Sequence, residues 1–440
     1  MKAATCLRIL HDRYLSASVR QNYWNARAFV GEVGRLANSR NAGFRSHVLN
    51  DLAHYWFDAL QPITGQIAER AAAAVGWLLR AQAVTPDDGV SLGWFPCAVD
   101  AAGWRPSYPE TTGYIISSLL AYARRFGEAR ARAAALAMAR WEIGIQMPSG
   151  AVQGGPVCSP DLQTPAAFNT GMVLEGWCSA YQDTPDSAIL AAARRAADFL
   201  VADLDADGYF RTNGQFVQSG EIKTYTCLCA WPLHRFGALC GEHRYAAAAV
   251  RAVEAALRQQ RPNGWFAQNS LLRSDAPLTH TLGYTLQGIL EVGALTGRDD
   301  FISAVRRSVD HLLPRIRGDG YLPGMFYEDW EPACFSSCLT GSAQIAVVCY
   351  RLADLVQRHE YRDVADRLLD FLKPLQALAA PVDDANGALP GSFPIFGDYM
   401  RGGYPNWATK YLLDALLLQL DLRADPTTFE RALASQAAAQ

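Results

Sequence analysis

One threonine recurs six times along the chain at nearly even spacing. It stands near the start of six apolar, helix-like stretches, among them "PETTGYIISSLL" and "LTHTLGYTLQGI". The intervals between successive copies are 58, 56, 55, 59 and 69 residues. An interval of this size, kept along most of a chain, indicates stacked copies of one supersecondary unit. The copies are Thr112, Thr170, Thr226, Thr281, Thr340 and Thr409.

A glycine followed by an aromatic or aliphatic pair precedes each of these threonines by 17 to 22 residues, as in "GWF" and "GYF". Before the glycine comes a second helix-like stretch, often rich in alanine, such as "AERAAAAVGWLLRAQ". The repeating unit is therefore a helix, a long glycine-containing loop, a second helix and a short link. The glycines are Gly93, Gly150, Gly208, Gly264, Gly320 and Gly387.

Six helical hairpins can close into a ring, so the sequence predicts an all-α fold, an (α/α)6 toroid with an inner and an outer ring of helices. The six-hairpin barrel is expected to span residues 67–420. Residues 1–66 have no place in the repeat, and "NDLAHYWFDAL" has helical apolar spacing, so they are expected to form an N-terminal helical cap. Residues 421–440 are expected to form a C-terminal tail.

The repeat, with loops such as "PNGWF" and "DADGYF", resembles the toroid superfamily of six-hairpin glycosidases and terpenoid cyclases. The likeness covers about residues 67–420 and implies a carbohydrate-active member. The protonating terpenoid cyclases carry a DxDD motif that is missing here, and Asp383 and Asp384 stand in a turn-like segment. The zinc set of the lanthionine-cyclase toroids is also missing. Cys334 and Cys338 are four apart but lack a second pair of ligands, so we expect no metal and no cofactor.

Composition narrows the class of partner and the compartment. Half of the residues are hydrophobic and the formal net charge is −3, which excludes a disordered chain. No nucleic-acid motif is present, and we expect no membrane span because no run of about 18 apolar residues stands out. Several of the ten cysteines lie inside apolar, helix-like runs, and no export signal is recognised. We therefore expect reduced thiols and a cytoplasmic protein.

The loops are unequal in a way that locates the chemistry. Links from inner to outer helices are short, whereas loops from outer to inner helices are long and rich in Gly, Pro and Trp. Function concentrates on elaborated loops, here at the N-termini of the inner helices. Helix N-termini carry free N–H groups and a partial positive charge, so this mouth favours anionic groups such as carboxylates.

Two sets of candidate catalytic residues fall at this mouth. Glycoside cleavage needs an acid and a base or nucleophile, and the carboxylates proposed for these roles are Glu110, Asp329 and Glu331. A second set occupies the position just before the repeated threonine in three consecutive repeats: Asn169, Tyr225 and His280. Substrate contacts are expected from aromatic, charged and amide residues of the same loops and helix starts. These are Glu221, Lys223, Tyr327, Trp330, Asp398, Arg401, Asn406 and Trp407.

Several functions stay open at this point. A glycoside hydrolase using the carboxylates ranks slightly first because carboxylates are plentiful. The second set resembles that of toroid polysaccharide lyases, in which Asn holds a uronate carboxylate while Tyr and His move protons; proton abstraction at C5 would equally serve a uronate epimerase. A non-catalytic glycan-binding toroid is a third reading. Glu110 also suits a structural first-turn acid and His280 a helix cap. The expected partner is an oligo- or polysaccharide, and the oligomeric state is open.

Overall fold

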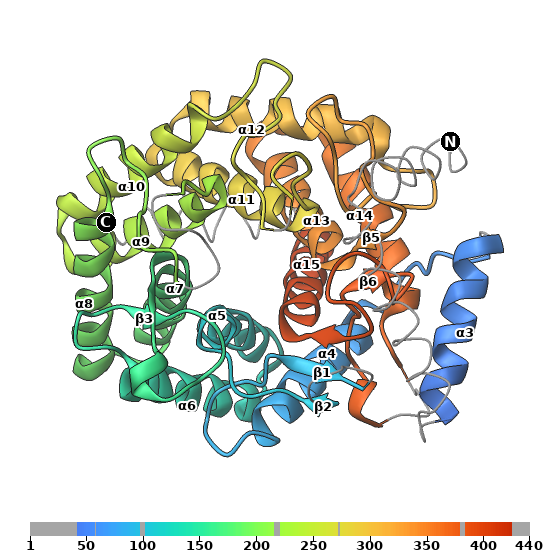
Figure 1. Cartoon of the computed structure of the whole chain (residues 1–440), viewed down its shortest axis with the longest axis horizontal. Helices are drawn as coiled ribbons and strands as arrows, with labels where there is room; N and C mark the ends of the chain where they lie inside the picture. The colour runs from blue at the N-terminus through green and yellow to red at the C-terminus, as the bar shows by residue number, and fades with distance from the viewer. Residues whose placement is uncertain are drawn as a thin grey trace, which may run out of the picture.

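The computed structural model describes residues 42–57, 59–96, 102–214, 221–271, 273–378 and 383–424. In this part of the chain six helical hairpins form a closed double ring, the (α/α)6 toroid (Figure 1). The outer helices are α4 (Ile67–Ala83), α6 (Ala129–Ile145), α8 (Ser187–Asp203), α10 (His243–Leu257), α12 (Asp299–Leu312) and α14 (His359–Leu372). The inner helices are α5 (Pro109–Phe126), α7 (Ala167–Asp183), η4 (Thr224–Cys229) with α9 (Ala230–Cys240), α11 (Thr279–Thr296), α13 (Leu339–Val356) and α15 (Asn406–Ala424).

Burial distinguishes the two rings. The inner helix α13 is buried without interruption from Leu339 to Tyr350, whereas the outer helix α12 alternates buried and exposed positions at helical spacing. A helix that is apolar on all sides needs packing on all sides, which the inner ring supplies. By length and composition α13 would also be apolar enough to cross a membrane, but 72% of it is buried inside the toroid.

The ring closes through its last inner helix. Inner helices contact one another in chain order, and α15 then packs against α4 and α5 of the first hairpin. Polar contacts tie the same ends of the chain together. The Trp77 indole donates to the carbonyl of Asp384 (2.8 Å), and the Gln376 amide donates to the carbonyls of Arg70 (3.0 Å) and Gly387 (2.9 Å).

The repeated glycine lies where each long loop crosses the next outer helix. Gly150, Gly208, Gly264, Gly320 and Gly387 all have a left-handed backbone, with φ from 80° to 97°. At Gly320, a Cβ atom would stand only 2.1 Å from the Arg367 carbonyl oxygen on α14, so no side chain fits. The first repeat differs from the prediction. Gly93 lies in a strand against Tyr404, and the position facing the next outer helix is taken by Gly89, against Trp141 of α6.

The repeated threonine lies inside the first turn of each inner helix rather than at its cap. All six copies are buried. In three repeats the hydroxyl accepts a backbone N–H from the preceding loop: Val90 to Thr112 (2.9 Å), Val152 to Thr170 (2.9 Å) and Leu389 to Thr409 (3.0 Å). The threonine therefore fastens the long loop to the inner helix that follows it.

The third inner helix departs from the regular pattern. It begins as the six-residue 3-10 helix η4, and α9 follows directly. Pro232 stands in the first turn of α9 and has no backbone N–H, so it cannot complete an α-helical hydrogen bond to the residues before it. Thr226 consequently lies in a 3-10 turn, where its hydroxyl donates to the Lys223 carbonyl (2.6 Å).

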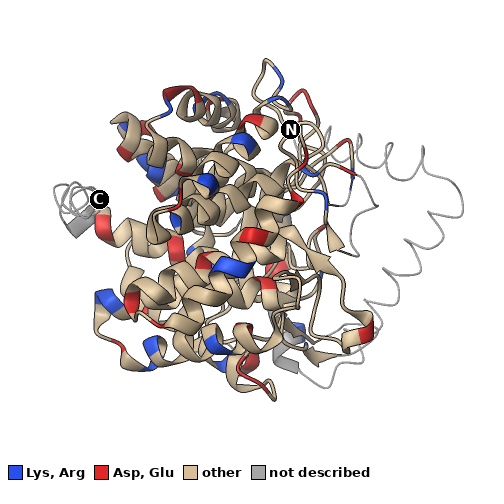
Figure 2. Cartoon of the chain, turned by 90° about the vertical axis from the view of Figure 1, so that its left-hand side faces the viewer, with Lys and Arg blue, Asp and Glu red and all other residues tan. Residues whose placement is uncertain are grey.

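Short antiparallel strands order the long loops on one side of the toroid. β1 (Gly93–Phe95) pairs with β2 (Gly103–Trp104) and β7 (Tyr404–Pro405), β3 (Val152–Gln153) with β4 (Pro165–Ala166), and β5 (Ser337–Cys338) with β6 (Ser392–Phe393). Figure 2 shows these loops and strands gathered at one end of the helices, with acidic and basic residues interspersed along the helices in view. The elaborated face predicted from the loop lengths is therefore present.

Helix α3 (Ala42–Phe57) lies outside the double ring (Figure 1). It packs on the loop face: Asp51 accepts the backbone N–H of Ile395 (2.6 Å), and the Tyr55 ring meets Phe393 edge-on at 5.7 Å. This helix belongs to the expected cap. Residues 1–41 of that cap and residues 425–440 of the expected tail lie outside the described residues.

Candidate active site

Glu110 is the carboxyl group that the inner helices bring to the mouth. It is the second residue of α5, after Pro109 at the first position, where a fixed φ suits the helix start and the dipole favours an acid. Burial raises the pKa of Glu110 to about 7, and the Tyr108 hydroxyl, which donates to Oε2 (3.1 Å), works in the opposite direction. Near neutral pH this carboxyl group is therefore divided between its acid and its carboxylate form.

Tyrosines from several elements surround Glu110. Besides burial, its charge contributes to the raised pKa values of the tyrosine hydroxyls, which places it among them; these are Tyr108, Tyr114, Tyr225, Tyr284 and Tyr399. The rings also meet one another, with centroids 6.4 Å apart for Tyr225 and Tyr284 and 5.2 Å apart for His280 and Tyr399. The hydroxyls stay protonated at neutral pH, so they are hydrogen-bond donors beside an ionisable acid.

His280 belongs to the same cluster. Its ring lies 4.4 Å from that of Tyr284, and Nδ1 is 2.8 Å from Oε1 of Gln344 on α13. Burial lowers the pKa of His280 to about 4, so the imidazole is neutral at pH 7. An amide oxygen only accepts, so Nδ1 carries the proton and Nε2 keeps a lone pair. The histidine at the start of α11 is thus oriented by a neighbouring inner helix and is able to take up a proton.

A buried ion pair lies beneath the tyrosines. Lys410 of α15 is 2.8 Å from Asp414, and its ammonium stands 4.1 Å from the Tyr411 ring and 4.7 Å from the Tyr114 ring. Although burial works in the opposite direction, the Asp414 carboxylate raises the pKa of Lys410, which keeps its charge. The cation is attracted to the negative faces of these two rings, and one of them, Tyr114, also interacts with the charge of Glu110.

Two other predicted residues at helix starts mainly hold loops in place. The Asn169 amide donates to the carbonyl of Gln153 in β3 (2.9 Å). The Asn406 amide donates to the Ser91 carbonyl (2.8 Å) and the Thr111 hydroxyl (2.7 Å). Both N–H groups of the Asn406 amide are therefore engaged within the protein, whereas the Asn169 amide uses one of its two N–H groups in this way. The uronate-holding role of Asn169 stays a prediction.

Trp407, by contrast, lies at the cluster. Its indole donates to the Tyr399 hydroxyl (3.0 Å), and its ring is 6.1 Å from that of Tyr108. The indole N–H leaves the Tyr399 oxygen with its own proton to donate. Trp407 is thus a neighbour that orients a site tyrosine.

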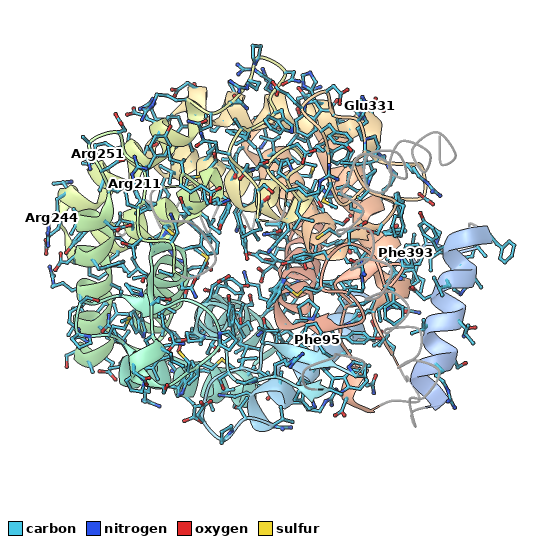
Figure 3. All side chains as sticks on the ribbon, in the orientation of Figure 1. Phe95, Arg211, Arg244, Arg251, Glu331 and Phe393 are labelled. Atoms are coloured by element: carbon cyan, nitrogen blue, oxygen red, sulfur yellow. The ribbon has the colours of Figure 1, made fainter. Side chains whose placement is uncertain are left out.

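The loop with Asp329 and Glu331 does not reach Glu110 as predicted. Glu331 pairs with Arg315, three residues after the end of α12 (3.0 Å), and lies near the periphery of the molecule (Figure 3). Trp330 is 3% exposed and donates to the Asn263 carbonyl (2.9 Å), so it packs inward and offers no open stacking face. The indole anchors this turn beside α12, stacked on His311, and the carboxylates beside it stay on the outer part of the loop face.

The remaining predicted contact residues brace the long loops. Lys223 pairs with Glu221 (2.8 Å) and donates to the Ser270 carbonyl (2.8 Å). Asp398 accepts the Ser336 hydroxyl (2.8 Å), and Arg401 donates to the Gly397 carbonyl (3.3 Å). Tyr327 lies under the Arg273 guanidinium, 5.5 Å from its ring centroid. None of these contacts reaches Glu110 or His280.

Five residues of the cluster escaped the sequence analysis: Tyr108, Tyr114, Tyr284, Tyr399 and Gln344. Tyr284 stands one helical turn after His280, and Gln344 stands four positions after Thr340, so the same period that revealed the repeat points to them. Tyr399 lies in an irregular loop, where no period applies. Among the described residues, no three His, Cys, Asp or Glu side chains form a group that would hold a metal ion.

Comparison with solved structures shows the same toroid in several carbohydrate-active enzymes. An unsaturated glucuronyl hydrolase specific for heparin superposes with a TM-score of 0.65 at 16% identity, over 82% of this chain and 98% of that one. An unsaturated glucuronyl hydrolase from Bacillus sp. GL1, responsible for the degradation of glycosaminoglycan, gives 0.61 at 18% identity, over 80% and 96%. A variant of the unsaturated glucuronyl hydrolase from Streptococcus agalactiae, complexed with dGlcA-GalNAc6S, gives a TM-score of 0.61 at 11% identity, over 83% of this chain and 94% of that one. No protein-family model and no curated protein sequence matches the chain.

Proposed function

We propose that the chain is a glycoside hydrolase that cleaves uronate-containing oligosaccharides, with Glu110 as the proton donor. The observation that carries this proposal is the pKa of Glu110, raised to about 7 by burial at the mouth of the toroid. A departing sugar oxygen needs a proton as its bond to the anomeric carbon breaks, and an acid with a pKa near the working pH supplies it best. The glucuronyl hydrolases that share the toroid support a uronyl substrate.

His280 is proposed as the partner of Glu110. The reaction also needs a group that takes a proton from the attacking water, and Nε2 of the neutral imidazole provides a lone pair for it. In this scheme Glu110 gives its proton to the glycosidic oxygen, water adds to the anomeric carbon, and the water proton passes to His280. The proton then returns from His280 to Glu110 through solvent, and the enzyme is restored.

The substrate carboxylate is proposed to lie among the tyrosine hydroxyls. Tyr225, Tyr284 and Tyr399 keep their protons at neutral pH and are able to donate to an anionic oxygen. The inner-helix N-termini and the Lys410 ammonium below the rings add positive potential at the same place. The eight described cysteines are free thiols, which supports the further proposal that the enzyme works in the cytoplasm.

A lyase or C5-epimerase is the second candidate, because the neutral His280 and the nearby tyrosines also suit abstraction of a carbon-bound proton. Assays on a panel of uronate oligosaccharides, with saturated or unsaturated ends, distinguish the hydrolase, the lyase and the epimerase. Hydrolysis releases new reducing ends without creating the ultraviolet absorbance of unsaturated uronate. A lyase creates that absorbance. An epimerase changes the C5 signals in NMR spectra and releases no new ends.

The decisive variant is Glu110→Gln, which keeps the shape of the side chain and removes its acid. On a cleaved glycan we expect kcat to fall by about 10²- to 10⁴-fold with the melting temperature retained. Glu69→Gln is the matched control, because Glu69 is exposed on the outer helix α4. Full activity of Glu110→Gln on a true substrate would exclude the assigned acid. The lyase would be favoured if the wild-type reaction creates ultraviolet absorbance and if His280→Ala, but not Glu110→Gln, loses activity.

A further inference from the structure

A groove of about 710 Å³ opens on the loop face, apart from the cluster around Glu110. One wall comes from the loop between α10 and α11, with Arg261, Trp265 and Asp275. The other wall comes from the loop between α12 and α13, with Tyr327, Glu328 and Asp329. A volume of this size holds more than one sugar ring, because small-molecule sites start at about 300 Å³.

The inner end of the groove adjoins the site. Ala267 and Gln268 line that end, and their carbonyls accept the hydroxyl (2.6 Å) and the backbone N–H (2.9 Å) of Thr224. Thr224 immediately precedes Tyr225, which belongs to the tyrosine cluster. A linear ligand with one end beside Glu110 would thus be able to continue along the groove toward the edge of the molecule.

The lining carries one feature that indicates a polar ligand. Trp265 is 6% exposed, and its indole N–H has no hydrogen-bond partner among the described residues. A buried donor without a partner costs free energy, and such donors are rare unless water or a ligand satisfies them. A sugar hydroxyl is an acceptor of suitable size for this N–H group.

The charge of the groove disfavours the ligand class expected at Glu110. Asp275, Glu328 and Asp329 carry three negative charges. Arg261 and Arg273, which pairs with Asp275 (2.6 Å), carry two positive charges, so the groove has a formal net charge of −1 (2 − 3). Arg261 is itself beside Glu328, at 3.4 Å. An anionic sugar, sulfated or uronyl, is repelled there, whereas a sugar without charge is not.

We infer that this groove is a second binding site that holds the uncharged sugars on the leaving-group side of the cleaved bond and rejects anionic ones. The inference rests on the proposed glycoside hydrolase and adds a substrate class to it: a uronyl group at the centre, followed by sugars that carry neither sulfate nor carboxylate. The centre would then select an anionic sugar, and the groove would select uncharged sugars of the same oligosaccharide.

The test for the N–H donor uses Trp265→Phe, which keeps an aromatic ring and removes the indole N–H. We expect the ratio of kcat/KM for a long uronyl oligosaccharide to that for a uronyl disaccharide to fall about three- to tenfold. Trp231→Phe, on α9 and away from the groove, is the control and should leave this ratio unchanged. An unchanged ratio for Trp265→Phe in a folded, active enzyme would overturn the inference.

The test for charge uses the double variant Asp275→Asn, Glu328→Gln. The wild type should prefer an oligosaccharide with neutral outer sugars over the same chain sulfated on those sugars. Each charge removed should narrow that preference about two- to fivefold. Equal use of both substrates by the wild type would reject the charge argument.

Direct binding separates this inference from the proposed function. Calorimetric titration of Glu110→Gln with a neutral oligosaccharide, with and without Trp265→Phe, reports on the groove without catalysis. Binding that weakens with Trp265→Phe, in a protein that cleaves no uronate glycan, would retain the groove and reject the hydrolase. Cleavage of uronate glycans without any binding of neutral sugars in the groove would retain the hydrolase and reject the groove.

Discussion

At the scale of single residues, Glu110 is governed by two opposing neighbours. Burial favours the protonated acid, while the Tyr108 hydroxyl donates to the carboxylate and favours ionisation. The balance sets its pKa near neutrality, where both forms are populated. In the proposed mechanism, Tyr108 would therefore tune the pH range of catalysis without contacting the substrate.

Tyr108→Phe should move that pH range upward. Without the hydroxyl, the Glu110 carboxylate loses a hydrogen bond and the acid form survives to higher pH, so the alkaline limb of kcat/KM should shift to higher pH. The measurement is a pH profile of kcat/KM on a cleaved glycan. Tyr245→Phe serves as the control, because that hydroxyl bonds to Asp198 on the outer ring. A limb that stays in place or moves down would contradict the assignment of Glu110 as the acid.

At the scale of elements, the repeated threonine in the first turn of an inner helix fastens the loop before it in three of the repeats. The Thr170 hydroxyl accepts from Val152 and donates to the Ala166 carbonyl (2.7 Å), so one side chain joins β3, β4 and α7. Thr340 occupies the same position of α13, but its buried hydroxyl has no partner among the described residues. Thr170 and Thr340 therefore hold equivalent positions in two repeats, one with a hydrogen-bonded hydroxyl and the other without.

Thr170→Val should lower the free energy of unfolding by about 1–3 kcal/mol, because the buried Val152 N–H loses its acceptor. Thr340→Val should be neutral or stabilising, since it replaces an unpaired hydroxyl by a methyl group of the same shape. Denaturant unfolding of both variants gives the comparison. Equal losses in the two would mean that the threonine acts through packing alone.

The sequence predicted elements better than it predicted side-chain positions. The period of the threonines and glycines reflects backbone requirements shared by every hairpin, so it revealed the toroid and the elaborated face. Glu110, Tyr225 and His280, which the structure groups in one cluster, were selected as candidates because they stand at fixed offsets from that period. Asp329 and Glu331 were misplaced because the path of their loop depends on Trp330 anchoring against α12, a tertiary contact that no local pattern encodes. Tyr399 was missed for the same reason.

At the scale of the whole molecule, the toroid depends on a closure between its first and last hairpins. Gly387 crosses α4 with φ 97°, and a Cβ atom there would stand 2.2 Å from the Ala73 carbonyl oxygen. Gly387→Ala should therefore cost several kcal/mol of unfolding free energy, since it combines backbone strain with a collision between rigid groups.

Gly127→Ala is the control for this closure. Gly127 ends α5 with φ 66° and has open space around its Cβ position, so only the conformational cost of about 1 kcal/mol is expected. Thermal and denaturant unfolding should rank the two variants in this order. Similar losses would show that the glycine at the closure is required for its backbone angle and not for the close approach.

The contact between α15 and α4 also has a kinetic meaning. Neighbouring hairpins elsewhere in the barrel follow one another in the chain, whereas this seam joins its first and last hairpins. Beside it, Gln376 in the loop after α14 bonds to Arg70 of α4, more than 300 positions away. Long-range contacts of this kind pay the largest loop-closure entropy and form late. The barrel is thus expected to fold first as an open arc of hairpins, and the contact between the first and last hairpins forms in the final step. Hydrogen exchange of the native protein should then find its lowest-energy opening along this seam.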